Sequence, residues 1–300
     1  MAARATRSAS RKARLTEAVV TGPLGALSHD ELGVIFDGLA DPLQPAVAVA
    51  LSSTCLGLRT ALGAGLKVLK ERRLRAVSLC RKLGTSCWWL QVAHRLSWGV
   101  KRLTTDDVVT LGMILRTNGL PMLRCLELYC NGFGDAGVQA LCVGLGPGAA
   151  PALCTLNLLR TKLGPVGAEA LAAALRRGAM PKLEVLVLGT NPIGNQGVAA
   201  LAAPLRTMPA LETLYLHNCA IGDEGVASLV ADLGKDDFKK LVKLDLEYNE
   251  ITDVGMTRLA AAIDAGGLPK LEWHGSSLHG NPASYVAVHA VKDALAKRSE

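Results

Sequence analysis

Aromatic residues are scarce in this sequence: they make up 4% of its 300 residues, against 50% for the apolar residues as a whole. The core must therefore be aliphatic, built mainly from Leu, Val and Ala. Long apolar runs are missing too, because the longest uncharged stretches, such as 136–159, are broken by Gly, Pro and polar residues. We therefore expect a folded chain with no helix that crosses a membrane and no membrane partner.

Paired cysteines, a hydrophobic signal region and glycosylation sequons are also absent. The eight cysteines include no Cys-x-x-Cys, and no Asn-x-Ser/Thr occurs. These absences favour free thiols in a reducing compartment, cytoplasmic or nuclear. They disfavour structural zinc, whose tetrahedral sites usually draw on close ligand pairs.

Catalytic signatures are absent as well. The sequence has no phosphate-binding loop, no His-Glu-x-x-His and no Gly-x-Ser-x-Gly. A Gly-rich run at 144–148 follows an expected helix and precedes an expected strand, the reverse of the order that brings a helix N-terminus to a phosphate. We expect a protein that is not an enzyme and that needs no cofactor or metal.

Positive charge is confined to one end of the chain. The net charge is +7, but residues 1–102 carry 16 basic and 6 acidic side chains, whereas residues 103–300 carry 17 and 20. A basic surface extending over the whole molecule is therefore not predicted, and we expect no nucleic-acid partner.

A repeat of about thirty residues dominates the sequence from residue 123 onward. Five segments share the pattern LxxLxL: LRCLELYCN, LCTLNLLRT, LEVLVLGTN, LETLYLHNC and LVKLDLEYN, starting at Leu123, Leu153, Leu183, Leu211 and Leu241. Each is followed by a block with a Gly and then apolar residues at spacings of three and four, as in Val198, Leu201 and Leu205, which predicts a helix. One such unit cannot bury its own apolar face, whereas stacked units share a continuous core.

This pattern closely resembles the leucine-rich repeat of the ribonuclease-inhibitor type. The resemblance covers residues 91–300, with five full units from 123 to 270 and degenerate units at both ends. It implies an α/β solenoid, a horseshoe with parallel strands on the concave face and helices on the convex face. Asn131, Asn191 and Asn249 should then form an internal ladder of amide side chains. Thr161 and Cys219 replace Asn, so the ladder should be poorest around residues 217–221.

The residues between the leucines should point out of the concave face, because side chains alternate along a strand. Three of the four tyrosines of the chain fall there, without an evident packing need, and Tyr is favoured at binding hot spots. We therefore expect a protein partner with a basic patch and an apolar knob. The candidate binding residues are Glu127, Tyr129, Asn157, Leu159, Arg160, Val187, Tyr215, His217, Asp245, Glu247 and Tyr248.

The N-terminal region divides into a basic tail, residues 1–20, and a helical segment, residues 21–90. The first fourteen residues contain five basic side chains and no acidic one. They are interpreted as a disordered tail, with organelle import and nuclear import as alternatives. The helical segment has two interpretations, a cap that seals the repeat core or a separate binding element.

The binding interpretation rests on the order LSHDELGVIFDGLADP followed by LSSTC, which is similar to an F-box. That resemblance implies a Skp-type adaptor and a cullin ubiquitin ligase, although Ser28 stands where an F-box usually has Pro. The candidate adaptor-binding residues are Leu27, Leu32, Ile35, Phe36 and Leu39.

Residues 66–82 predict a basic amphipathic helix, either a solvated face or a contact with an acidic partner. Trp88, Trp89 and Trp98 follow it and are interpreted as a plug at the end of the repeat core. Three functions remain open: a substrate receptor of a cullin ligase, a free-standing scaffold, and a GTPase-activating protein of the Ran type that would use Arg160. Inhibition of ribonuclease is not expected, because a strongly acidic horseshoe would be needed.

Overall fold

The computed structural model describes residues 31–32, 35–36, 39–53, 62–117, 120–146, 148–234, 236–273 and 277–297. The chain forms two compact units, Met1–Trp88 and Trp89–Glu300. We call them the N-terminal unit and the repeat array. The basic tail, residues 1–20, and Leu27 lie outside the described residues.

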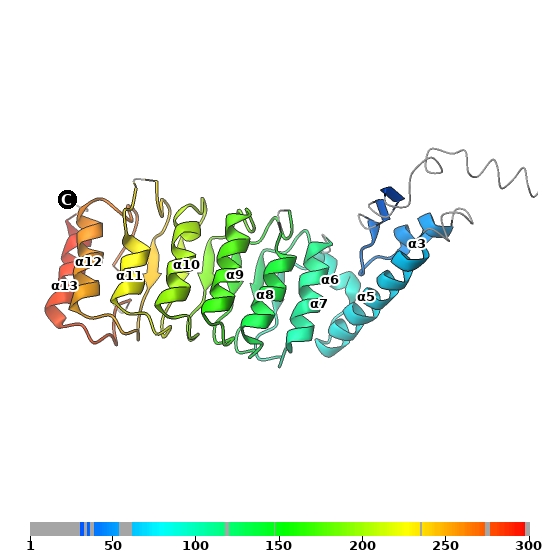
Figure 1. The fold of residues 1–300 in the computed structure, drawn as a ribbon, viewed down its shortest axis with the longest axis horizontal. Helices are drawn as coiled ribbons and strands as arrows, with labels where there is room; N and C mark the ends of the chain where they lie inside the picture. The colour runs from blue at the N-terminus through cyan, green and yellow to red at the C-terminus, as the bar shows by residue number, and fades with distance from the viewer. Residues whose placement is uncertain are drawn as a thin grey trace, which may run out of the picture. The chain divides into compact units, whose positions relative to one another are not determined.

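The repeat array is an α/β solenoid, as the sequence predicts (Figure 1). Its described strands form one parallel sheet in chain order: β1 (Arg95–Ser97), β2 (Cys125–Glu127), β3 (Thr155–Asn157), β4 (Val185–Val187), β5 (Thr213–Tyr215) and β6 (Lys243–Asp245). The helices are α7 (Thr105–Arg116), α8 (Gly134–Gly144), α9 (Pro165–Arg176), α10 (Gly194–Arg206), α11 (Asp223–Val230), α12 (Asp253–Asp264) and α13 (Tyr285–Ala296). Each of α7 to α12 follows its strand and packs beside the helix of the next repeat.

The strands pair in the register that the repeat predicts. Leu126, Leu156, Leu186 and Leu214 lie opposite one another and are fully buried. Because side chains alternate along a strand, the residues on either side of each leucine face out of the sheet. The predicted outward-facing columns are therefore in place.

The first repeat is more complete than its sequence indicates. Its strand β1 pairs with β2, and Leu96 occupies the central leucine position. Ala93 and Trp98 replace the two flanking leucines, and both are buried. The small Ala93 and the large Trp98 together fill the space that two leucines fill in the other repeats. Neither residue is Leu, so the LxxLxL pattern is not visible in this repeat.

The asparagine ladder exists and spans successive turns. Asn191 donates through Nδ2 to Leu158 O at 2.8 Å and Leu188 O at 2.7 Å, and its Oδ1 accepts the amides of Thr161 and Leu163. Asn131 and Asn249 repeat this arrangement. Asn281 continues the ladder into the last, irregular repeat, where its Oδ1 accepts from Ile251 N at 3.1 Å.

Where the ladder lacks Asn, the preceding turn changes its conformation. Cys219 offers only two long contacts, from Sγ to Leu188 O and His217 O, both 3.4 Å, as expected for the weak part of the ladder. No amide oxygen is then available for the turn amide of Ile193, which bonds Asn191 O instead. Gly194 follows that tight turn and has a φ of 63°. In the repeat that precedes Thr161, the corresponding turn is followed by Gly134, whose φ is 64°. Glycine adopts this left-handed conformation without steric cost.

A second ladder links the N-termini of the helices. Asp223 in the first turn of α11 accepts from Thr252 N, Thr252 Oγ1 and Gly255 N at 2.6–2.9 Å, and so caps α12. Asp135 and Asn195 cap α9 and α11 in the same way. The N-termini of α9, α11 and α12 are thereby fixed to the preceding helix through otherwise unpaired amides.

The N-terminal unit contains α3 (Ala46–Ser53) and α5 (Gly63–Lys82), with helical residues also at 31–32, 35–36 and 39. Its core includes Leu32, Phe36, Ala48 and Leu69. The short helix α6 (Cys87–Val92) spans the boundary between the two units.

The tryptophan plug is only partly correct. Trp98 is buried, but Trp88 and Trp89, both in α6, are 68% and 42% exposed. Leu90 and Ala93 take the buried positions that the plug was expected to fill. In a six-residue helix two consecutive side chains cannot share one face, and here the leucine faces inward.

Candidate functional site

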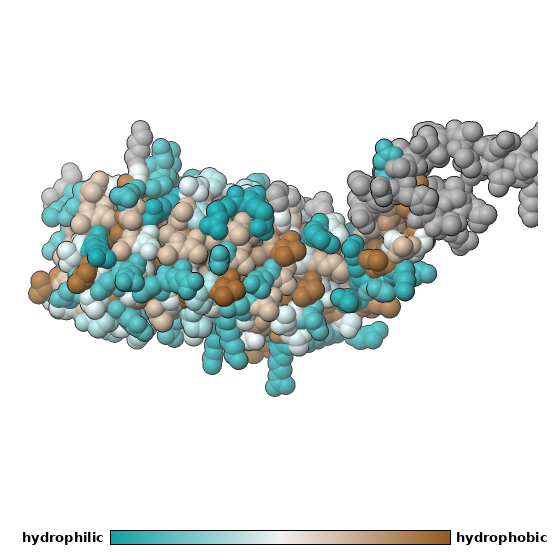
Figure 2. Space-filling model, viewed as in Figure 1, coloured by the Kyte–Doolittle hydropathy of each residue, from teal (hydrophilic) through white to brown (hydrophobic). Residues whose placement is uncertain are grey.

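The helix-covered face of the array offers little for recognition. Figure 2 shows hydrophilic and small residues mixed over this face, with strongly hydrophobic residues scattered rather than gathered. Scattered apolar side chains are normal on a protein surface. The strand-lined concave face is therefore the stronger candidate, and its side chains differ in character from one end to the other.

At the C-terminal end, strands β5 and β6 bring together a polar and aromatic group. We call it the C-terminal concave patch and define it as Tyr215, His217, Lys243, Asp245, Glu247 and Tyr248. Tyr215 pairs with Asp245 across the two strands, and Lys243 Nζ lies 4.9 Å from the centroid of the Tyr215 ring. A cation at this distance from an aromatic face is attracted by the ring.

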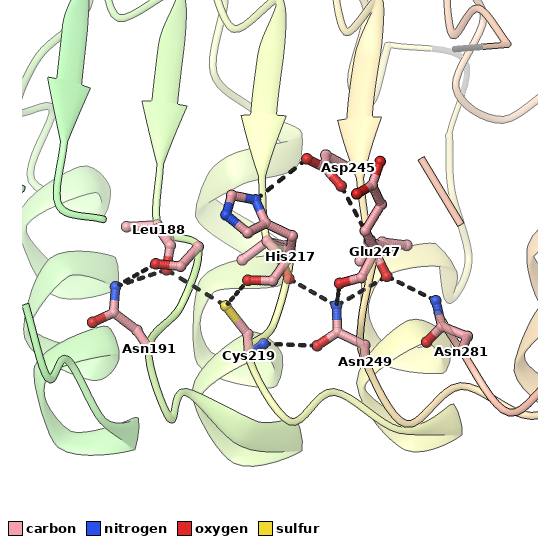
Figure 3. A network of polar contacts seen from close by, with 11 residues as sticks. Leu188, Asn191, His217, Cys219, Asp245, Glu247, Asn249 and Asn281 are labelled. Atoms are coloured by element: carbon pink, nitrogen blue, oxygen red, sulfur yellow. Dashed lines mark hydrogen bonds and ion pairs between the residues drawn. The ribbon is translucent and has the colours of Figure 1, made fainter. Parts of the chain in front are cut away.

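His217 and Asp245 face each other within this patch (Figure 3). His217 Nδ1 lies 3.3 Å from Asp245 Oδ2, without the alignment of a hydrogen bond. The other oxygen, Asp245 Oδ1, accepts from Glu247 N at 3.0 Å. Asp245 is only 8% exposed, so its role is to hold neighbouring residues of the patch in place, with little surface left for a partner.

Glu247 and Tyr248 are consecutive members of the patch, and Tyr248 is its exposed residue. Tyr248 is 57% exposed, and the Glu247 side chain is half-buried. Among the described residues no cation pairs with the Glu247 carboxylate. The patch thus offers one free carboxylate beside an exposed aromatic ring.

At the N-terminal end, Glu127 is held by two residues that the candidate set missed. Arg95 Nη2 lies 3.1 Å from Glu127 Oε1, and Ser97 Oγ donates to Glu127 Oε2 at 2.5 Å. Both come from β1, one repeat length before Cys125 and Glu127. Arg95 and Ser97 could have been found from the sequence by subtracting thirty residues from the outward-facing positions Cys125 and Glu127.

Two of the three tyrosines on this face, Tyr129 and Tyr248, do have a packing role, contrary to the expectation. The Tyr129 ring lies over Gly99, where a Cβ would come within 2.2 Å of it. The Tyr248 ring covers Gly280 in the same way, and the His217 ring covers Gly189. A glycine in a neighbouring repeat thus provides the space for each ring. The leucine spacing that places these rings on the concave face gives no sign of this packing.

The remaining candidates line the middle of the face. Asn157 accepts from Leu159 N at 3.0 Å through its own side chain, so it also stabilises the end of its strand. Leu159 and Val187 are half-buried, and Arg160 is exposed at φ 54°. These residues form an uncharged centre with one cation at its edge.

The charges of the array are polarised along its length. Residues 89–182 contain ten basic and five acidic side chains, whereas residues 183–273 contain seven and thirteen. The acidic half contains the C-terminal concave patch. Such a gradient favours one orientation of a charged partner.

The F-box-like candidates are divided between core and surface. Leu32 and Phe36 are buried in the N-terminal unit, at 6% and 2% exposure, so they stabilise it. Ile35 and Leu39 are 36% and 37% exposed. Of the candidates that the structure describes, only Ile35 and Leu39 are exposed enough to contact another protein directly.

Membrane-spanning helices and metal-binding clusters are both absent from the described residues. No helix there has the length and apolarity needed to traverse a bilayer. No group of three or more His, Cys, Asp or Glu side chains is placed to hold a metal ion in that same part of the chain.

Comparison with known proteins identifies the repeat. The model of the leucine-rich-repeat family matches residues 119–142, 179–202, 208–230 and 239–260. No curated protein matches the chain. A solved structure of a TLR13–ssRNA13 complex is similar at 20% identity and a TM-score of 0.30; the match covers 68% of this chain and about one third, 35%, of that one. Four segments of this chain thus match the leucine-rich-repeat model, and they lie within the parallel solenoid described above.

Proposed function

We propose that the chain is a non-catalytic binding protein whose concave face holds a protein partner, centred on the C-terminal concave patch. The observation that carries this proposal is the Glu247 carboxylate, which has no ion-pair partner among the described residues, beside the exposed Tyr248 ring. A carboxylate flanked by an aromatic ring suits an arginine or lysine side chain, which pairs with the charge and stacks on the ring. The uncharged surface near Val187 suits an apolar knob beside that basic group.

The test is affinity purification from the native cell extract with the full chain and matched variants. Glu247→Gln and Tyr248→Ala should each lose the same set of proteins. Glu224→Gln, an exposed carboxylate in α11 on the helix-covered side, should retain them. A partner retained equally by all variants would show that the patch does not bind it.

A finer proposal is that the protein is the substrate receptor of a cullin-type ubiquitin ligase, with a Skp-type adaptor on the N-terminal unit. The exposure of Ile35 and Leu39 supports it. Ile35→Asp/Leu39→Asp should then lose the adaptor and cullin but keep the concave-face partners. If neither adaptor nor cullin co-purifies with the unaltered chain, a free-standing scaffold is the better description.

The alternative of a GTPase-activating protein of the Ran type depends on Arg160. Its exposure on the turn after β3 permits contact with a partner, and among the described residues no carboxylate forms an ion pair with it. The measurement is GTP hydrolysis by Ran with and without the chain. Acceleration abolished by Arg160→Ala would establish this function in place of passive binding.

A further inference from the structure

Helix α3 of the N-terminal unit is apolar on every side. Its sequence AVAVALSS contains no charged residue. Val47 and Val49 are nevertheless 55% and 42% exposed. A helix that is hydrophobic all round is ordinarily buried, so Val47 and Val49 are more exposed than the composition of α3 predicts.

A groove of about 330 Å³ lies between α3 and α5. Leu69, 1% exposed, is at its floor, and Val49 and Leu66 line its walls. Leu74 projects at its edge with 70% of its surface exposed. The groove is thus apolar inside and bordered by a large, accessible leucine.

The rim of this groove is basic. Helix α5 carries seven basic residues and one acidic residue, and Lys70 and Arg73 line the groove itself. Arg73 Nη1 donates to Pro42 O at 3.1 Å and Leu43 O at 2.8 Å, so it fixes the segment that leads into α3. Lys70 is exposed, and no carboxylate pairs with it among the described residues.

We propose that this groove binds an acidic amphipathic helix of a partner protein. Apolar side chains at every third or fourth position would enter the groove, and flanking Asp or Glu side chains would meet Lys70 and its neighbours. Residues 1–14 of the chain itself carry five basic and no acidic side chains, so their charge does not complement the basic rim. Nucleic acid would meet the charge but would leave the apolar floor uncovered. The proposal is independent of the concave-face function.

The experiment measures fluorescence anisotropy of labelled peptides with the full chain at near-physiological salt. The first peptide, about 18 residues long so that it can be helical, has Leu at positions i, i+3, i+4 and i+7 with Glu on the flanks. The second replaces every Glu with Lys. The third keeps the composition of the first with its Leu positions scrambled. Only the first should bind.

Variants of α5 locate the binding. Lys70→Glu and Leu74→Ala should each weaken binding of the acidic peptide by about tenfold or more. Arg75→Glu, an exposed cation of the same helix that does not line the groove, should change it by less than about twofold. Glu247→Gln should leave it unaltered, which separates this site from the concave face. Since Lys70 and Leu74 are exposed, their variants should unfold at the same temperature as the unaltered chain.

Three outcomes would overturn the proposal. Equal binding of the acidic and basic peptides would show non-specific apolar adsorption. Absence of binding at millimolar concentrations of the acidic peptide would remove the proposed ligand class. A dimer seen by sedimentation velocity and abolished by Leu74→Ala would instead assign the groove to a second copy of this chain.

Discussion

At the scale of single residues, the turns of the array depend on whether an amide side chain is present at the ladder position. Asn191 satisfies buried donors and acceptors from two repeats, while Cys219 makes only long sulfur contacts. Both side chains are buried, so a group without a partner there has no access to water. The two positions should therefore respond very differently to truncation.

Asn191→Ala is expected to lower the free energy of unfolding by about 3 kcal/mol, because it leaves several buried backbone groups unpaired. Cys219→Ala should cost about 1 kcal/mol, since it removes only weak contacts and little volume. Urea unfolding followed by circular dichroism measures both. Equal losses for the two variants would contradict the hydrogen-bond account of the ladder.

The buried thiols make stability depend on alkaline pH. Burial raises the pKa of Cys142 and Cys219 to about 12, from an ordinary value of 9.0. The unfolded thiols ionise near pH 9 while the folded ones stay protonated, so their stabilising contribution is complete below about pH 9 and is lost as the pH rises toward 12. Urea midpoints at pH 7.5 and pH 10 measure this loss. It should be smaller in Cys142→Ala/Cys219→Ala, and equal losses would refute the assignment.

At the scale of elements, the N-termini of α9, α11 and α12 are held by side chains of the preceding helix. This arrangement differs from ordinary capping, in which a helix supplies its own cap, as Thr104 does for α7 by accepting from Asp107 N. The cap of α12 combines both, because Thr252 accepts from Val254 N while bonded to Asp223. A change in α11 should therefore loosen α12.

Asp223→Ala is expected to lower stability by about 1–2 kcal/mol, in the range of a lost helix cap. Partial burial raises the pKa of Asp223, but hydrogen bonds from Thr252 and Gly255 outweigh it and hold the pKa below its usual value. A lowered pKa gives stability that is present above the unfolded pKa and lost as the pH falls through the folded one. Hydrogen exchange of the first turn of α12 should accelerate in the variant. Unchanged exchange there would refute the cap.

At the scale of the whole molecule, each repeat of the array packs mainly against the repeats before and after it. The last repeat has no following neighbour, so its apolar face must be covered in another way. Residues 277–281 are not a β-strand, but they hydrogen-bond to the segment that contains β6. Ser277 O accepts from Leu246 N and His279 O accepts from Tyr248 N, both at 2.8 Å. Helix α13 packs against α12 beyond them. The irregular last repeat therefore closes the core, as its sequence position predicts.

Removal of residues 271–300 should leave these amides and the apolar face of α12 exposed. Because repeats are stabilised by their neighbours, we expect a lower urea midpoint for the remaining array, together with aggregation. Val286→Asp, which changes a side chain that is 77% exposed on α13, is the matched control and should be nearly neutral. A truncated chain as stable and soluble as the control would show that the last repeat is dispensable.

The sequence alone determined the fold of the array, because a leucine period near thirty residues allows few ways to bury the apolar face of each unit. It also determined the outward columns and the ladder positions, which follow from strand alternation. It missed β1, where Ala93 and Trp98 exchange sizes, and it missed Arg95 and Ser97 with it. Only the tertiary structure decided which polar side chains are already engaged. Among the described residues, Asp245 contacts His217 and accepts from Glu247 N, whereas no cation pairs with the Glu247 carboxylate. That difference depends on the directions of side chains in neighbouring repeats, which no linear pattern records.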